Sequence, residues 1–122
     1  MTVHGHSGAV ADLAFDAAGT LLASAGATDC MARVWRAATG DCVFCVFLAH
    51  RPVAGVALHG TLLALSMRDQ VGFADVEEGS PRVFAVSRAV AVDRPLKVRF
   101  VGPRRVVFGQ DVDGCPLCEL AV

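Results

Sequence analysis

The sequence has little charge and no excess of either sign. Charged residues make up 19% of the 122 positions and the formal net charge is −1, whereas hydrophobic residues make up 54%. A chain with this charge balance has no overall attraction for nucleic acid or for an anionic membrane surface. Its apolar content argues against disorder, and we expect one folded domain over residues 1–122.

The sequence also lacks the long apolar segments of exported and membrane proteins. Its first residues, MTVHGHSG, have neither the basic nor the apolar stretch of a secretory signal. The longest strongly apolar run, CVFCVFLA at 42–49, is far shorter than the roughly 20 residues that span a bilayer. Five cysteines, an odd number, favour reduced thiols over a disulfide framework. We therefore expect a soluble intracellular protein, in the cytoplasm or nucleus, with no membrane partner.

An internal repeat is the clearest feature that the sequence does contain. The letters GTLLA occur at 19–23 and again at 60–64. VADLAF begins at Val10, VAGVAL begins 43 residues later at Val53, and LKVRFV begins a further 43 residues on at Leu96. A period of about 40 residues is typical of solenoids and propellers.

Each unit has the composition of short β-strands separated by turns. Runs rich in Val, Phe and Leu alternate with Gly, Asp, Pro and Ser, and no stretch has the pattern of a helix. The sequence therefore predicts an all-β fold of about three four-stranded antiparallel blades. The approximate repeats are residues 3–45, 46–79 and 80–122.

The first unit carries a family resemblance. Residues 5–36, GHSGAVADLAFDAAGTLLASAGATDCMARVWR, contain Gly-His, a strand, an apolar pair followed by Ser, and an Asp six residues before Trp. This order and spacing resembles a WD repeat, the unit of the β-propeller family of that name. The resemblance implies that four side chains form a buried, hydrogen-bonded structural set: His6, Ser24, Asp29 and Trp35. Buried ring N–H groups need acceptors, and a hydroxyl and a carboxylate supply them.

The match to the family weakens along the chain. Arg36 stands where the family usually has Asp after Trp, and the segment from Ser24 to Asp29 is one residue longer than usual. In the second unit Ala74 replaces the Trp, and the third unit keeps only the strand pattern. A closed propeller usually has four to eight blades. About three blades therefore imply that a longer chain, a second copy or a partner chain completes the ring.

Two short motifs suggest catalysis or zinc binding, but each lacks part of the pattern. GHSGA resembles the nucleophile elbow of serine hydrolases, with Ser7 as the nucleophile, yet no full strand precedes it and no helix follows. Two C-x-x-C pairs, Cys42 with Cys45 and Cys115 with Cys118, have the spacing of zinc ligands. Residues three apart in a strand point to opposite faces, however, so the two cysteines of such a pair cannot bind one ion unless the chain turns between them. We expect no catalytic residue and no zinc.

Two further groups could be taken for metal sites. His4 and His6 would share one face of a strand and could be joined by His50, but the family resemblance places His6 in the core. DVDG at 111–114 resembles the start of a calcium loop without its later ligands, and a hairpin turn is the simpler interpretation. We expect neither a metal nor another cofactor.

The resemblance implies a noncatalytic protein-interaction scaffold, because WD-repeat propellers generally act as platforms for other proteins. Loops 50–53 and 67–70 fall where the family usually presents its upper face, so Arg51 and Arg68 are candidate partner-binding residues. An RNA-associated assembly subunit, as in ribosome biogenesis, is the alternative, although a solvated basic face is the simpler interpretation and nucleic acid is not expected. The candidate basic surface for that alternative is Arg94, Lys97, Arg99, Arg104 and Arg105.

Overall fold

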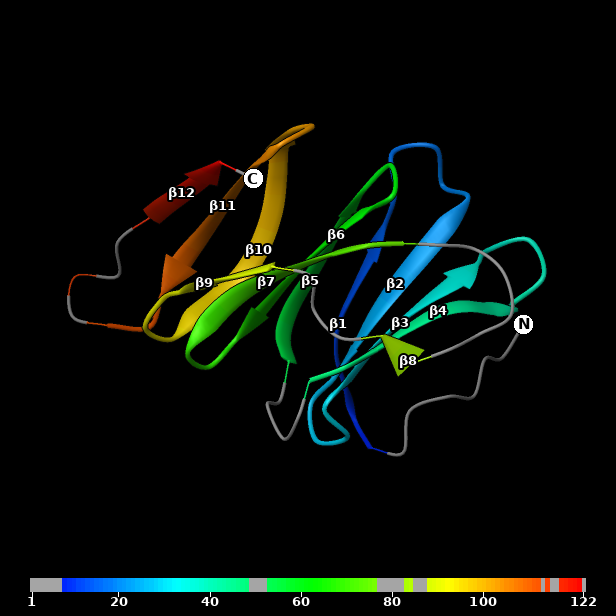
Figure 1. Ribbon diagram of the computed structural model, residues 1–122, viewed down its shortest axis with the longest axis horizontal. Helices are drawn as coiled ribbons and strands as arrows, with labels where there is room; N and C mark the ends of the chain where they lie inside the picture. The colour runs from blue at the N-terminus through cyan, green and yellow to red at the C-terminus, as the bar shows by residue number, and fades with distance from the viewer. Residues whose placement is uncertain are drawn as a thin grey trace.

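The chain folds into twelve β-strands in three sheets, and its described residues contain no helix. The computed structural model describes residues 8–48, 53–76, 83–84, 88–112, 114 and 117–121. The prediction of an all-β fold with three blade-like sheets is confirmed (Figure 1). The three sheets contain five, four and three strands in chain order.

The first sheet contains β1 (Val10–Phe15), β2 (Leu21–Gly26), β3 (Met31–Arg36) and β4 (Cys42–Phe47) in antiparallel order, and the two-residue β8 (Val83–Phe84) pairs parallel to β4. The second sheet contains β5 (Val53–His59), β6 (Leu62–Met67), β7 (Gln70–Asp75) and β9 (Arg88–Ala91). The third sheet contains β10 (Pro95–Gly102), β11 (Arg105–Gln110) and β12 (Leu117–Ala121). The strand β9 falls in the predicted interval 80–122 but belongs to the sheet of the second unit.

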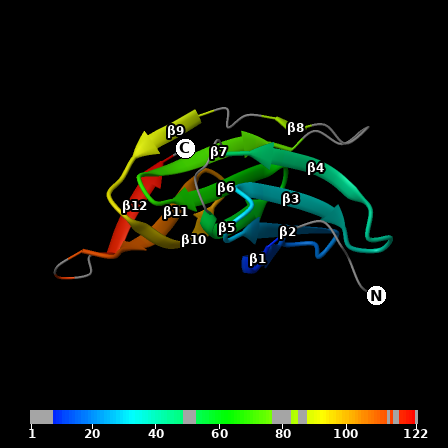
Figure 2. The ribbon, with the colours of Figure 1, turned by 90° about the horizontal axis from the view of Figure 1, so that it is seen from below.

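The three sheets fan out from their first strands. Figure 2 shows β1, β5 and β10 lying near one another on one side of the molecule, with the later strands of each sheet spreading away from them. The strand β5 contacts both β1 and β10, so the second sheet lies between the other two. This is the arrangement of neighbouring propeller blades, whose first strands line the central axis.

The position of the second sheet between the other two explains which residues are buried. One apolar cluster joins the first and second sheets and includes Val34, Phe44 and Leu65, and another joins the second and third sheets and includes Phe73 and Val98. The middle sheet is therefore buried on both faces, which explains why its strands are almost continuously apolar. The flanking strands β1 and β12 instead alternate between exposed and partly buried positions.

The repeated GTLLA letters mark the turn into the second strand of two successive sheets. Gly19 and Gly60 have φ values of 72° and 59°, in the left-handed region that glycine adopts without steric cost. In the first turn the Asp16 carboxylate accepts hydrogen bonds from the backbone and hydroxyl of Thr20, both at 2.8 Å. Burial tends to raise the pKa of Asp16, but these bonds and one from Leu21 hold it below its usual value.

Candidate protein-interaction surface

The structure brings together two of the four residues that the WD resemblance singles out. Trp35 lies on β3 and Ser24 on β2, and the indole Nε1 donates a hydrogen bond to the serine hydroxyl at 2.9 Å. Both side chains are buried. Asp29 lies in the β2–β3 loop, where its carboxylate accepts a hydrogen bond from the backbone of Met31 at 3.1 Å. His6 lies outside the described residues.

The second sheet has an apolar contact at the matching position. Trp35 lies opposite Leu22 in the first sheet, and Ala74 lies opposite Leu63 in the second. Ala74 is buried without a polar side chain, so this sheet depends on packing where the first has an indole–hydroxyl pair. The hydroxyl of buried Ser66 has no hydrogen-bond partner among the described residues.

Loops from all three sheets meet at one end of the fold around Arg68. The carbonyl of exposed Arg68, in the β6–β7 loop, accepts a hydrogen bond from Arg94 N at 2.8 Å, and the carbonyl of Arg94 accepts one from Asp111 N at 2.9 Å. These backbone bonds fix the loops relative to one another. Together the loops border an open pocket of about 360 Å³, lined by Ala27, Val53, Ala54, Arg68, Arg94, Pro95, Leu96 and Asp111. Arg51, the other candidate partner-binding residue, lies outside the described residues.

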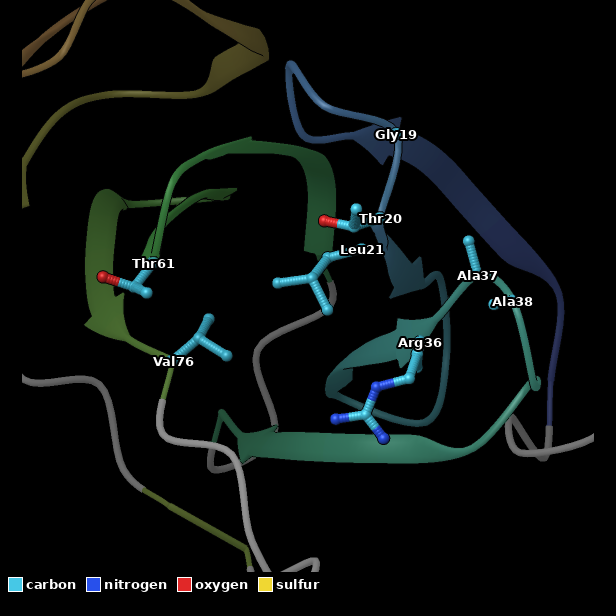
Figure 3. A pocket seen from close by; sticks show the side chains of 8 residues that line it. All are labelled: Gly19, Thr20, Leu21, Arg36, Ala37, Ala38, Thr61 and Val76. Atoms are coloured by element: carbon cyan, nitrogen blue, oxygen red, sulfur yellow. The ribbon is translucent and has the colours of Figure 1, made fainter.

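A second pocket lies between the first and second sheets at their turn ends. Its volume is about 680 Å³, and Figure 3 shows its eight lining residues: Gly19, Thr20, Leu21, Arg36, Ala37, Ala38, Thr61 and Val76. Arg36 is its charged member. Sequence reasoning did not assign this residue to a pocket, although its departure from the family pattern was a usable signal.

Two members of the predicted basic surface contact the seam between the sheets, which is the region where their first strands β1, β5 and β10 lie side by side. Lys97 Nζ donates to the carbonyls of Ala11 at 2.9 Å and Ala54 at 2.7 Å. These three residues are spaced 43 apart in sequence and thus hold equivalent places in the three units. Arg99 lies 3.4 Å from the Asp12 carboxylate, which also accepts a hydrogen bond from Val56 N at 3.0 Å. This network links β1, β5 and β10.

The remaining basic residues are spread along the third sheet. Arg94 precedes β10 and lies 3.6 Å from the Asp93 carboxylate. Arg104 and Arg105 follow β10, and Arg105 pairs with Glu119. A strand of eight residues spans about 25 Å. The structure therefore does not gather the five predicted residues into one compact basic patch.

The first C-x-x-C pair lies far from Cys118, the described member of the second pair. Cys42 and Cys45 are on β4 of the first sheet and Cys118 is on β12 of the third, with the second sheet between them (Figure 1). Cys118 donates to Gln110 Oε1 at 3.0 Å. Among the residues that the structure describes, no group of three or more His, Cys, Asp or Glu could hold a metal ion. Cys115, His4 and His50 lie outside that part of the chain.

The hydrolase motif and the calcium-like motif are only partly described. Ser7 lies outside the described residues, and the strand β1, rather than the helix of a nucleophile elbow, follows it. Asp111 lies in the loop between the antiparallel strands β11 and β12. In the described part of the chain, no helix is long and apolar enough to cross a membrane.

Comparison with known proteins gives a family match over the first unit and a likeness in fold over most of the chain. Residues 1–36 match the family model described as WD domain, G-beta repeat. No curated protein sequence matches the chain significantly. Among solved structures the chain is similar to Hsv2 of Kluyvelomyces marxianus, a WD40 β-propeller protein, with a TM-score of 0.68 and 13% sequence identity. The match covers 84% of this chain and 37% of Hsv2, so the chain spans little more than a third of that protein. The family match shows a WD repeat at residues 1–36, and the three sheets together have the fold of part of a β-propeller.

Proposed function

We propose that this protein is a noncatalytic scaffold that binds a partner protein through the end surface around Arg68. WD40 domains generally bind other proteins. The observation that supports this particular surface is the convergence of loops from three sheets on one open pocket. Loops fixed on a rigid β-scaffold are the usual place for recognition, because they present side chains without reorganising the core.

The chemistry of the pocket indicates the kind of partner segment that would fit. Arg68 and Arg94 supply two guanidinium groups against the single carboxylate of Asp111, and Pro95 and Leu96 supply apolar surface beside them. Arginine binds carboxylates in a planar, two-pronged geometry and is common among residues that dominate interfaces. We therefore propose a partner segment that presents an acidic side chain next to an apolar one.

The test is a charge reversal at Arg68 in the full chain, measured against a partner protein recovered with the unchanged chain. Arg68→Glu, alone and with Arg51→Ala, is expected to weaken binding by about tenfold or more, as loss of an anchoring arginine does. Arg104→Glu is the matched control, because Arg104 is an exposed arginine in the β10–β11 turn, outside the pocket. Equal affinities for all of these proteins would show that the Arg68 surface is not the binding site.

The RNA-associated alternative has less support from the structure, since Lys97 and Arg99 contact the seam between strands. Salt dependence distinguishes the two functions. Binding to nucleic acid falls steeply as salt rises, because counterions are released from phosphates. A protein partner on a partly apolar surface should be much less sensitive. Steep salt dependence together with RNA in the purified complex would favour the alternative.

A further inference from the structure

A β-bulge in β4 brings two cysteines to the same place. Trp35 of β3 lies opposite Cys42, whereas the neighbouring Val34 lies opposite Phe44, so β4 has one extra residue at this point. The extra residue breaks the usual alternation of side chains, and the sulfurs of Cys42 and Cys45 lie 3.4 Å apart. The expectation that residues three apart must face away from each other is wrong here, because it assumes a regular strand.

Arg33 of β3 approaches both sulfurs. Its Nη1 lies 3.2 Å from the sulfur of Cys45 and 4.0 Å from that of Cys42. Its Nε is buried and has no hydrogen-bond partner in the described part of the chain. A thiol sulfur is a weak acceptor, whereas a thiolate or an oxygen bound to sulfur is a much stronger one. The guanidinium therefore favours an ionised or oxidised sulfur at this site.

The two thiols differ in accessibility. Cys45 is 5% exposed, whereas Cys42 is only partly buried. Burial, together with the hydrogen bond and the charge interaction with Cys42, raises the pKa of the Cys45 thiol to about 11, although Arg33 opposes these effects. Cys45 is therefore a neutral thiol at pH 7.

We propose that Cys42 and Cys45 form a peroxide-sensitive modification site that closes reversibly to an intramolecular disulfide. Accessible thiolates beside a second cysteine are the usual redox-sensing arrangement. Arg33 is a positioning residue that holds the sulfurs and donates to the oxygen of the intermediate. Before oxidation both thiols are reduced. After oxidation, a thiol such as glutathione reopens the disulfide by thiol–disulfide exchange.

The oxidation balances with one molecule of hydrogen peroxide. The Cys42 thiolate attacks a peroxide oxygen, the O–O bond breaks, and the released hydroxide takes a proton to form water. Cys45 then loses its proton and attacks the sulfur of the Cys42 sulfenic acid, forming the S–S bond and releasing a second water. Two electrons pass from the two thiols to the peroxide. Since a disulfide bond is about 2.0 Å long and the sulfurs lie 3.4 Å apart, they must approach by about 1.4 Å.

Peptide mapping of the full chain tests this proposal without any substitution. Trypsin releases residues 37–68 as one peptide, because Pro52 prevents cleavage after Arg51, and Cys42 and Cys45 are its only cysteines. After limited peroxide treatment and alkylation of free thiols, we expect this peptide to be unalkylated and two hydrogens lighter. The peptide 1–33, with Cys30 alone, serves as the internal control. Because Arg33 lies beside the sulfurs and favours the oxidised form, closure should need roughly tenfold less peroxide than oxidation of Cys30.

Substitutions then separate reaction chemistry from fold. Cys45→Ser should stop at a sulfenic acid on Cys42, whereas Cys30→Ser, the matched control, should leave disulfide formation unchanged. Arg33→Leu should slow oxidation and shift its pH profile upward, and Arg33→Lys should restore part of the rate. The proposal is overturned if peptide 37–68 keeps two alkylatable thiols while Cys30 is oxidised. A disulfide that joins two chains would overturn it as well.

Discussion

Trp35 and Ser24 show how one pair of side chains can support a blade. The indole fills space between strands, and its N–H would lose a hydrogen bond to water on burial if Ser24 did not accept it. The hydroxyl of Ser66, on the corresponding strand of the second sheet, has no such partner among the described residues. The two buried serines therefore differ in what their hydroxyl groups contribute.

This difference predicts opposite results for the same substitution. Ser24→Ala should lower the free energy of unfolding by about 1–3 kcal/mol, because it leaves a buried donor unpaired. Ser66→Ala should cost little or should stabilise, since it removes an unpaired hydroxyl. Urea unfolding of the purified chain measures both values. Equal losses for the two variants would mean that the Trp35–Ser24 hydrogen bond contributes nothing.

Removing the indole itself should have a larger effect. Trp35→Ala deletes a buried aromatic side chain, for which the expected cost is about 3–5 kcal/mol. A domain of ordinary stability has only about 5–15 kcal/mol in total, so this variant is expected to melt at a much lower temperature or to unfold. An unchanged melting curve by circular dichroism would contradict the assignment of Trp35 to the core.

At the scale of elements, the close approach of β5 and β10 depends on Gly55. A Cβ atom at this position would lie 2.7 Å from the Ser66 hydroxyl, 3.0 Å from Lys97 Cα and 3.2 Å from Val98 N. The last two atoms belong to the backbone of the neighbouring sheet and cannot rotate away. The packing of the second and third sheets thus requires glycine here.

We therefore expect Gly55→Ala to destabilise the protein by about 1–3 kcal/mol, as overpacking does. Gly102→Ala is the matched control, because no atom lies within 4 Å of its added Cβ and its φ is not in the left-handed region. Thermal melts of the two variants give the comparison. If Gly55→Ala were as stable as Gly102→Ala, the sheets would be able to separate at this seam without loss.

The bulge in β4 is an element-scale feature that local sequence patterns did not reveal. The sequence CVFCVF is typical of a regular strand, in which the side chains of Cys42 and Cys45 would point to opposite faces. Which residue is left unpaired depends on the alignment of β4 with β3, so it is decided between strands. The sequence of β4 alone does not contain this alignment, so it could not predict the bulge.

At the scale of the whole molecule, the two sheets that flank the middle one carry exposed apolar side chains. Leu13 and Phe15 on β1 are 56% and 59% exposed, and Leu117 on β12 is 79% exposed. The middle sheet shows what covers such faces, because it is buried between two neighbours. A longer chain, a second copy or a partner chain that supplied further blades would cover this apolar surface.

Light scattering of the isolated 122-residue chain tests whether these faces bind protein. We expect a mass above that of one chain, because exposed apolar surface and open strand edges favour association. Phe15→Ser combined with Leu13→Ser should reduce the mass. A monomer with a cooperative melt in the unchanged chain would show that three sheets are stable without further cover.

The sequence by itself determined the class of fold, the number of units and the turns that divide them. These features depend on residues close together in the chain: β-forming runs, turn glycines such as Gly19 and Gly60, and the Ser24 to Trp35 segment of one unit. Only the tertiary structure decided that Lys97 bonds to two neighbouring sheets, that loops of three sheets meet at Arg68, and that Cys42 touches Cys45. These contacts depend on how separate strands pack and align, and no local pattern contains that alignment.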